Sequence, residues 1–105
     1  MYKLTNHEEL ILISIWKLVG NAYIVTIRKF FKQTTGKSIN CGSLCNTLTS
    51  LVRKGFIESE ESKPTAQPGG RRKVLYSLTA EGKKALNHAY KIKKLTWDGF
   101  SEFIF

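Results

Sequence analysis

The sequence has few cysteines and prolines, a shortage of acidic residues, and no long hydrophobic run. Its first strongly apolar stretch, Leu10–Trp16, is far too short to span a bilayer. Glu8 and Glu9 precede this stretch instead of basic residues, and no small-residue cleavage site follows it, so it does not have the form of a secretory signal. We therefore expect a cytoplasmic protein with no membrane partner.

Cysteine is limited to Cys41 and Cys45, four residues apart in one expected helix. A disulfide at that spacing within a continuous helix is geometrically poor, which fits a reducing compartment. We expect both thiols on the buried face of the helix, where cysteine behaves as a small apolar residue. A redox sensor would instead need an exposed, reactive thiolate.

Metal and catalytic patterns are also missing. The only histidines, His7 and His88, do not complete a zinc-ligand spacing with the cysteines, so we expect no metal and no cofactor. Neither histidine has a partnered nucleophile, the carboxylates are scattered, and no glycine motif could cradle a phosphate. We therefore expect that the protein is not an enzyme.

Positive charge, by contrast, is abundant. Lysine and arginine number 17 against 8 acidic residues, which gives a net charge of +9. Such an excess favours a polyanionic partner, either nucleic acid or an acidic membrane surface. The alternative is that the charge only keeps a small protein soluble. A length of 105 residues corresponds to one domain.

Three helices are expected in the first half of the chain. The first begins at a capping box formed by Thr5 and Glu8, or one residue later by Asn6 and Glu9, and runs to about Val19. Its apolar residues cover nearly the whole circumference, so it needs burial on more than one side. Because the domain is small, we expect that a second subunit covers one side. The other two helices are expected over residues 22–35 and 41–54.

The third helix divides into an apolar and a polar face. Short hydrogen-bonding side chains lie on the polar face, which a DNA major groove could accommodate, although any soluble helix needs such a face. The apolar residues recur at helical spacing and predict the buried face: Cys41, Leu44, Cys45, Leu48, Leu51 and Val52.

A hairpin and a long last helix are expected to follow. Strands are expected over residues 56–60 and 73–78, joined by a loop that contains both prolines. Thr79 is expected to cap the last helix. The order helix, helix, helix, hairpin, helix is that of a winged helix-turn-helix, a mainly α fold with a small β-hairpin. We divide its single domain into a DNA-binding region, 1–79, and a dimerisation helix, 80–105.

The third helix and the hairpin tip are the predicted DNA-binding elements. Three adjacent cations follow two glycines at the tip, which suits phosphate contacts or insertion into the minor groove. The alternative is a basic run that is merely solvated. A glycine at the start of the third helix would allow a phosphate to approach the backbone closely. The predicted DNA-binding residues are Asn40, Gly42, Ser43, Asn46, Thr47, Ser50, Arg71, Arg72 and Lys73.

An ordered set of residues between position 8 and about 86 carries a family resemblance. It consists of Gly20, Tyr23, Gly42, Ser43, Leu44, Leu48, Leu51, Lys54, Gly55, Phe56, Ile57, Glu58, Gly69, Gly70, Arg71, Tyr76, Leu78, Thr79, Glu81 and Gly82. This set resembles the PadR family of bacterial transcription regulators. The resemblance implies a dimer that represses transcription, with the last helix forming much of the dimer contact.

Two departures from the family pattern concern DNA contact. Cys45 and Asn46 stand where members commonly carry Tyr and Pro, so Cys45 should not inherit a role from the tyrosine hydroxyl. Arg72 stands where members carry Pro and adds a charge to the wing. Neither change threatens the fold, and both leave the base specificity open.

The resemblance and the apolar pattern together predict a dimer interface. Some members of the family bind flat aromatic compounds between the two subunits, so Trp97 is a candidate to stack on a small aromatic effector. The alternative is that Trp97 only packs in the dimer core. The predicted interface residues are Trp16, Leu86, Tyr90, Trp97, Phe100 and Ile104.

The function predicted from these observations is sequence-specific binding of double-stranded DNA by a transcription regulator, a repressor acting as a homodimer. The first alternative is a winged-helix module for protein contact, whose charge serves only solubility. RNA binding comes third, because the chain lacks interleaved surface aromatics that stack on unpaired bases.

Overall fold

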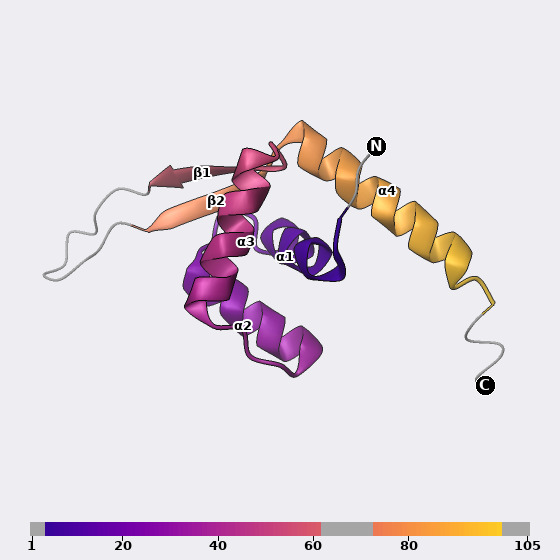
Figure 1. Ribbon diagram of the computed structural model, residues 1–105, viewed down its shortest axis with the longest axis horizontal. Helices are drawn as coiled ribbons and strands as arrows, with labels where there is room; N and C mark the ends of the chain where they lie inside the picture. The colour runs from indigo at the N-terminus through magenta and orange to yellow at the C-terminus, as the bar shows by residue number, and fades with distance from the viewer. Residues whose placement is uncertain (1–3, 62–72, 100–105) are drawn as a thin grey trace, which may run out of the picture.

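The computed structural model describes residues 4–61 and 73–99. Three helices pack together, a hairpin projects from one side of them, and a last helix extends on the other (Figure 1). This mostly helical winged-helix architecture confirms the predicted fold class. The elements are α1 (Asn6–Lys17), α2 (Ile24–Thr35), α3 (Cys41–Arg53), β1 (Ile57–Glu61), β2 (Val74–Leu78) and α4 (Ala80–Thr96).

The predicted capping box fixes the start of α1. The Thr5 hydroxyl accepts a hydrogen bond from the Glu8 backbone N–H at 3.1 Å, and the Glu8 carboxylate accepts one from the Thr5 N–H, also at 3.1 Å. These two bonds satisfy backbone donors that lack partners within the helix. The helix ends at Lys17, two residues earlier than expected, and a turn with Gly20 at φ +79° leads to α2.

One hydrophobic core joins α1, α2, α3 and β1. The leucines of α3 are fully buried, as their spacing predicts, and they pack against isoleucines of α1 and α2. Since this core holds the three helices together, it sets which side of α3 faces solvent. The core residues are Ile11, Leu12, Ile15, Ala22, Ile27, Phe31, Ile39, Leu44, Leu48, Leu51 and Ile57.

The predicted buried face of α3 was too wide. Cys41, Cys45 and Val52 are exposed, although their helical spacing from the leucines placed them on the apolar face. The core contacts only the stripe that carries the leucines, and these three residues lie along one flank of it. Helical spacing predicts where the buried face of a helix lies, but the packing of neighbouring elements decides how wide that buried face is.

The hairpin is tied to the helices at its base. Its strands are antiparallel, with Ile57 opposite Leu78 and Ser59 opposite Tyr76. The Tyr76 N–H donates to the Ala22 carbonyl at 2.8 Å, which attaches β2 to the turn between α1 and α2. Ile57 is buried, whereas the other four residues of β1 are exposed. The expected loop 62–70 lies outside the described residues.

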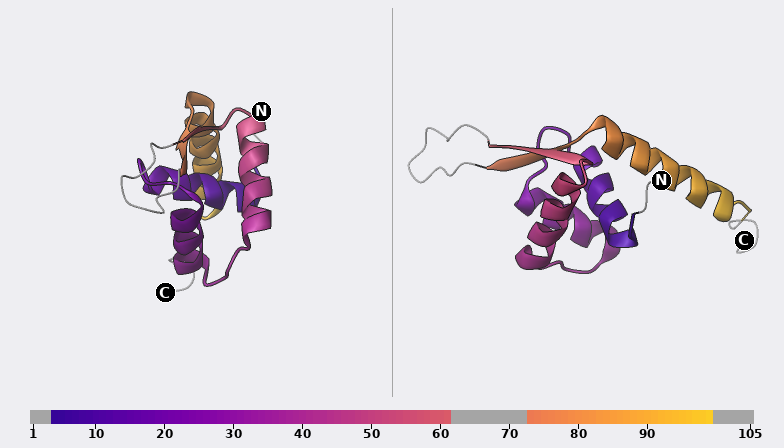
Figure 2. Two further views of the ribbon diagram at one scale, coloured as in Figure 1. Left: turned by 90° about the vertical axis from the view of Figure 1, so that its left-hand side faces the viewer. Right: turned by 45° about the horizontal axis from the view of Figure 1, so that its top comes forward.

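Helix α4 is packed only at its start. Gly82 and Ala85 are buried, whereas all described residues from Tyr90 onward are exposed. Beyond this packed part, α4 is tied to the start of α1 by an ion pair between Lys93 Nζ and Glu9 Oε1 at 2.9 Å. The helix projects from the body (Figure 2), and the radius of gyration of 15.7 Å exceeds the value of about 13 Å for a compact chain of this length. None of the helices in the described ranges is long and apolar enough to cross a membrane.

Glu8 is expected to make stability depend on pH. Burial by itself would raise its pKa, but hydrogen bonds from Lys54 Nζ, at 2.6 Å, and from the Thr5 N–H outweigh burial and hold the pKa below its usual value of 4.5. Because the pKa is lower in the folded state, this stabilisation is present above the unfolded-state pKa and is lost as pH falls through the folded-state pKa.

Urea denaturation at pH 7 and pH 3 measures this effect. Glu8→Gln should be less stable than the parent at pH 7, and the difference between the two proteins should shrink at pH 3. An equal difference at both pH values would contradict the assigned role of the ionised carboxylate.

Candidate nucleic-acid interface

The outer face of α3 presents short polar side chains to solvent. Ser43 and Asn46 are exposed, and Thr47 and Ser50 are half-exposed. Within the described part of the chain, the side chains of Ser43, Asn46 and Ser50 make no hydrogen bond to the protein. The Thr47 hydroxyl donates to the Ser43 carbonyl at 3.0 Å and keeps its acceptor lone pairs. This face can therefore exchange water for the donors and acceptors of a base edge.

Asn40 and Gly42 shape the start of α3. The Asn40 Oδ1 accepts a hydrogen bond from the Ser43 N–H at 2.7 Å, so this oxygen caps the helix, and only its amide NH₂ remains as a donor for another partner. A Cβ on Gly42 would meet Asn40 Oδ1 at 3.4 Å, an ordinary contact. The fold therefore does not require glycine at position 42.

The hairpin contributes one described cation, Lys73. Its Nζ lies 4.4 Å from the centre of the Tyr23 ring and 3.5 Å from the Tyr23 hydroxyl. This contact holds the lysine against the residue that precedes α2. The other predicted wing cations, Arg71 and Arg72, lie outside the described residues.

Basic residues on and after α2 were missed as candidate site residues. Arg28 and Lys29 are exposed on α2, and the Arg28 Nε donates to the Ile39 carbonyl at 3.0 Å, which fixes the connection into α3. A sequence signal for this surface exists, because no acidic residue occurs between positions 10 and 57. The cations in that stretch are Lys17, Arg28, Lys29, Lys32, Lys37, Arg53 and Lys54.

Acidic residues follow this stretch in β1. Glu58 and Glu60 project from one face of the hairpin, opposite Ser77 and Leu75 in the register. Ser59 and Glu61 lie on the other face. Two carboxylates thus share the first face, and a polyanion would be repelled from it.

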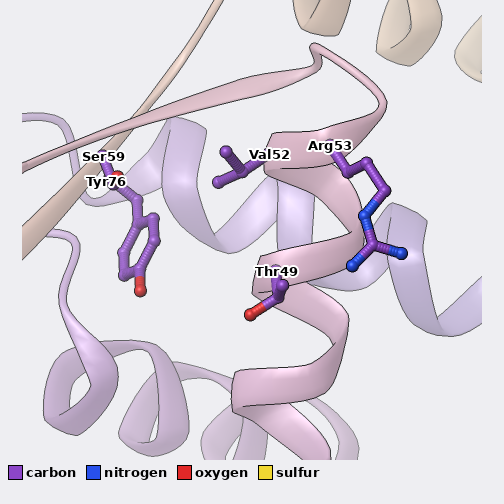
Figure 3. Close-up of a pocket in the computed structure, with 5 residues that line it drawn as sticks. All are labelled: Thr49, Val52, Arg53, Ser59 and Tyr76. Carbon is purple, nitrogen blue, oxygen red and sulfur yellow. The ribbon is translucent and has the colours of Figure 1, made fainter.

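An open cleft separates α3 from the hairpin (Figure 3). It has a volume of about 370 Å³, and Val52 and Tyr76 face each other across it, while the Arg53 guanidinium points away. Burial raises the pKa of Tyr76, and the nearby Cys45 thiol adds to the effect. The lining residues are Thr49, Val52, Arg53, Ser59 and Tyr76.

Residues 4–61 and 73–99 hold no group of three or more histidine, cysteine or acidic side chains arranged to bind a metal ion.

The model of the transcriptional regulator PadR-like family matches residues 12–88, which include α2, α3 and the hairpin. The chain belongs to the PadR-like family. Its members are transcriptional regulators, and the resemblance predicted from the sequence is thereby confirmed.

Solved structures of similar proteins have the same fold. RosR from H. salinarum is 25% identical, with a TM-score of 0.71 over 91% of this chain and 79% of that chain. A transcriptional regulator from Thermoplasma acidophilum is 24% identical, with a TM-score of 0.70 over 93% and 92%. A PadR-like transcription factor from Bacteroides fragilis is 20% identical, with a TM-score of 0.65 over 93% and 85%. No curated protein matches the chain significantly.

Proposed function

We propose that this PadR-like protein is a sequence-specific double-stranded DNA-binding regulator that acts as a homodimeric repressor. The observation that carries the proposal is the polar, outward face of α3 within a stretch, residues 10–57, that contains no carboxylate. A recognition helix needs side chains that can bond to base edges, and its surroundings must not repel phosphates.

In this proposal, α3 enters the major groove. Asn46 can pair with an adenine edge through two hydrogen bonds, and Ser43 and Ser50 can bond to base edges or phosphates. Exposed cations on α2, among them Lys29 and Lys32, would contact the flanking phosphates. Arg71, Arg72 and Lys73 would hold the wing on the backbone, as predicted from the sequence.

The homodimer is supported by two exposed aromatic residues, Tyr90 in α4 and Trp97 at its C-cap. Tyr90 and Trp97 are 62% and 56% exposed, and a spacing of seven residues places them on one face of the helix. Leu86, one turn before Tyr90, is only half-buried by the core of its own subunit. Trp16 on α1 is also exposed, whereas Phe100 and Ile104 lie outside the described residues.

Two-fold pairing along α4 would cover this face and present two α3 helices to half-sites about one DNA turn apart. Trp97 remains the candidate to stack on an aromatic effector, because its side chain is exposed. Such an effector stays a prediction.

Duplex binding is expected to weaken steeply with salt. If about six phosphates are neutralised per dimer, log affinity should fall against log salt with a slope near −5. The measurement is a titration of duplexes obtained by selection from the source genome. A flat salt dependence, or equal affinity for every duplex, would contradict the proposal and favour a protein-contact module.

Two sets of variants separate the roles of α3 and the wing. Asn46→Ala should change which sequence is preferred, at about 1–3 kcal/mol per lost base contact. Joint replacement of Arg71, Arg72 and Lys73 by alanine should instead weaken all duplexes to a similar degree. If the triple variant binds normally, the wing cations are merely solvated.

A further inference from the structure

Two exposed thiols lie one helical turn apart on α3. Cys41 is the first residue of the helix, Cys45 follows four residues later, and both are free. Side chains at this spacing have Cβ atoms about 5–6 Å apart, whereas a disulfide needs a Cβ separation of about 3.8 Å. One soft metal ion bound by both sulfurs would span a longer distance, because it adds two metal–sulfur bonds of about 2.3 Å each. The regular helix therefore favours a bridging ion over a disulfide.

Arg28 brings a positive charge to this pair of thiols. Its Nη1 donates to Cys41 Sγ at 3.4 Å, while its Nε is held by the Ile39 carbonyl at 3.0 Å. A monovalent ion bound by two thiolates forms a complex with one negative charge. The guanidinium is in position to balance that charge.

The two thiols offer two ligands, and this number decides which metal ion fits the site. Structural Zn²⁺ takes four ligands, and the described residues hold no group of three or more candidate side chains. A monovalent, thiophilic ion that accepts two ligands fits better, and thiolate sulfur is the ligand type that selects Cu(I).

We propose that Cys41 and Cys45 form a two-coordinate Cu(I) site, with Arg28 as a positioning residue that balances its charge. On binding, each thiol releases its proton to solvent, two sulfur–copper bonds form, and the oxidation state of copper does not change. The regulatory consequence rests on the proposed function. Because α3 would lie against DNA, the anionic complex would repel phosphates and weaken duplex binding.

Anaerobic titration of the intact chain with Cu(I), in competition with a chromophoric Cu(I) chelator, tests the site. We expect one copper per chain, with ultraviolet thiolate-to-copper absorption. Cys41→Ser and Cys45→Ser should each lower the affinity at least a hundredfold. Arg28→Gln should lower it about tenfold, and Arg28→Lys should retain most of it. Ser43→Ala, on the other side of α3, is the matched control and should leave the affinity unchanged.

Thermal melting of each variant shows that a loss of copper does not come from unfolding. The site is overturned if either cysteine variant that melts like the parent binds copper as tightly as the parent. It is also overturned if the parent cannot compete with the chelator, or if Zn²⁺ displaces Cu(I) from the thiols.

Duplex binding by the same preparations separates this inference from the proposed function. Copper should weaken duplex binding by the parent chain but not by the Cys41→Ser, Cys45→Ser double variant. If copper binds and leaves duplex affinity unchanged, the regulatory consequence is wrong. If the copper-free chain binds no specific duplex, the proposed function fails while the metal site stands. Intact duplex binding without copper uptake overturns the metal site alone.

Discussion

Gly82→Ala is expected to destabilise the fold by about 3 kcal/mol or more, because the new methyl group has no space. A Cβ at this position would lie 2.0 Å from the Phe56 carbonyl oxygen and 3.3 Å from Leu78 Cδ2. Phe56 cannot move away easily, since the same carbonyl accepts a hydrogen bond from the Thr79 N–H at 3.1 Å. Costs of this size arise from overpacking at buried positions. Thermal melting should show a midpoint lower by more than about 10 °C.

Gly42→Ala is the matched control, since it makes the same change within another helix. Its Cβ would meet only Asn40 Oδ1, at 3.4 Å. Alanine is the better helix former by up to about 1 kcal/mol, so this variant should melt at the same temperature as the parent or higher. If both variants melt alike, the close approach of α4 to Phe56 does not explain the glycine at position 82.

Replacing both Tyr90 and Trp97 by alanine is expected to convert the proposed dimer into a monomer. Each substitution occurs twice in a two-fold dimer, and buried aromatic anchors cost about 2 kcal/mol or more when truncated. The two copies of Trp97 by themselves therefore contribute at least about 4 kcal/mol to the free energy of association. Their loss weakens association about a thousandfold. Sedimentation at micromolar concentration measures the change, with the parent chain sedimenting as a dimer.

Leu95→Ala is the control on the same helix. Leu95 is 79% exposed, but it lies two residues before Trp97, about 200° away around the helix axis. We expect this variant to remain a dimer, although its side chain is more exposed than that of either aromatic residue. A monomeric parent chain would refute the proposed assembly, and a dimer that survives the double substitution would place the interface elsewhere.

The bounds of α1, α2 and α3 and the start of α4 were predicted to within about two residues, because their signals are local. The end of α4 was not, since the helix stops at Thr96 instead of continuing toward residue 105. The Thr5 and Glu8 capping box and Gly36 in the left-handed conformation at the end of α2 act through backbone groups a few residues away. The leucine stripe of α3 was also predicted correctly, because it depends only on the period of its own helix.

The site was harder to predict, because its geometry depends on contacts between elements. Nothing in the sequence pattern indicates that Lys73 stacks on Tyr23, fifty positions earlier, or that Arg28 reaches Cys41. The prediction that both cysteines are buried is wrong, because Cys41 and Cys45 are exposed. Their expected burial was the argument against a functional site at these thiols.

The sequence by itself determined the order of the elements, the family, the excess of positive charge and the polar composition of α3, since each of these is carried by local pattern and residue type. Only the tertiary structure decided which flank of α3 is open, that Gly82 lies against the Phe56 carbonyl, and how far α4 projects without cover. The physical reason is that a residue is buried only where another element packs against it. Periodicity predicts which face of its own element a residue lies on, and the neighbouring element decides whether that face is covered.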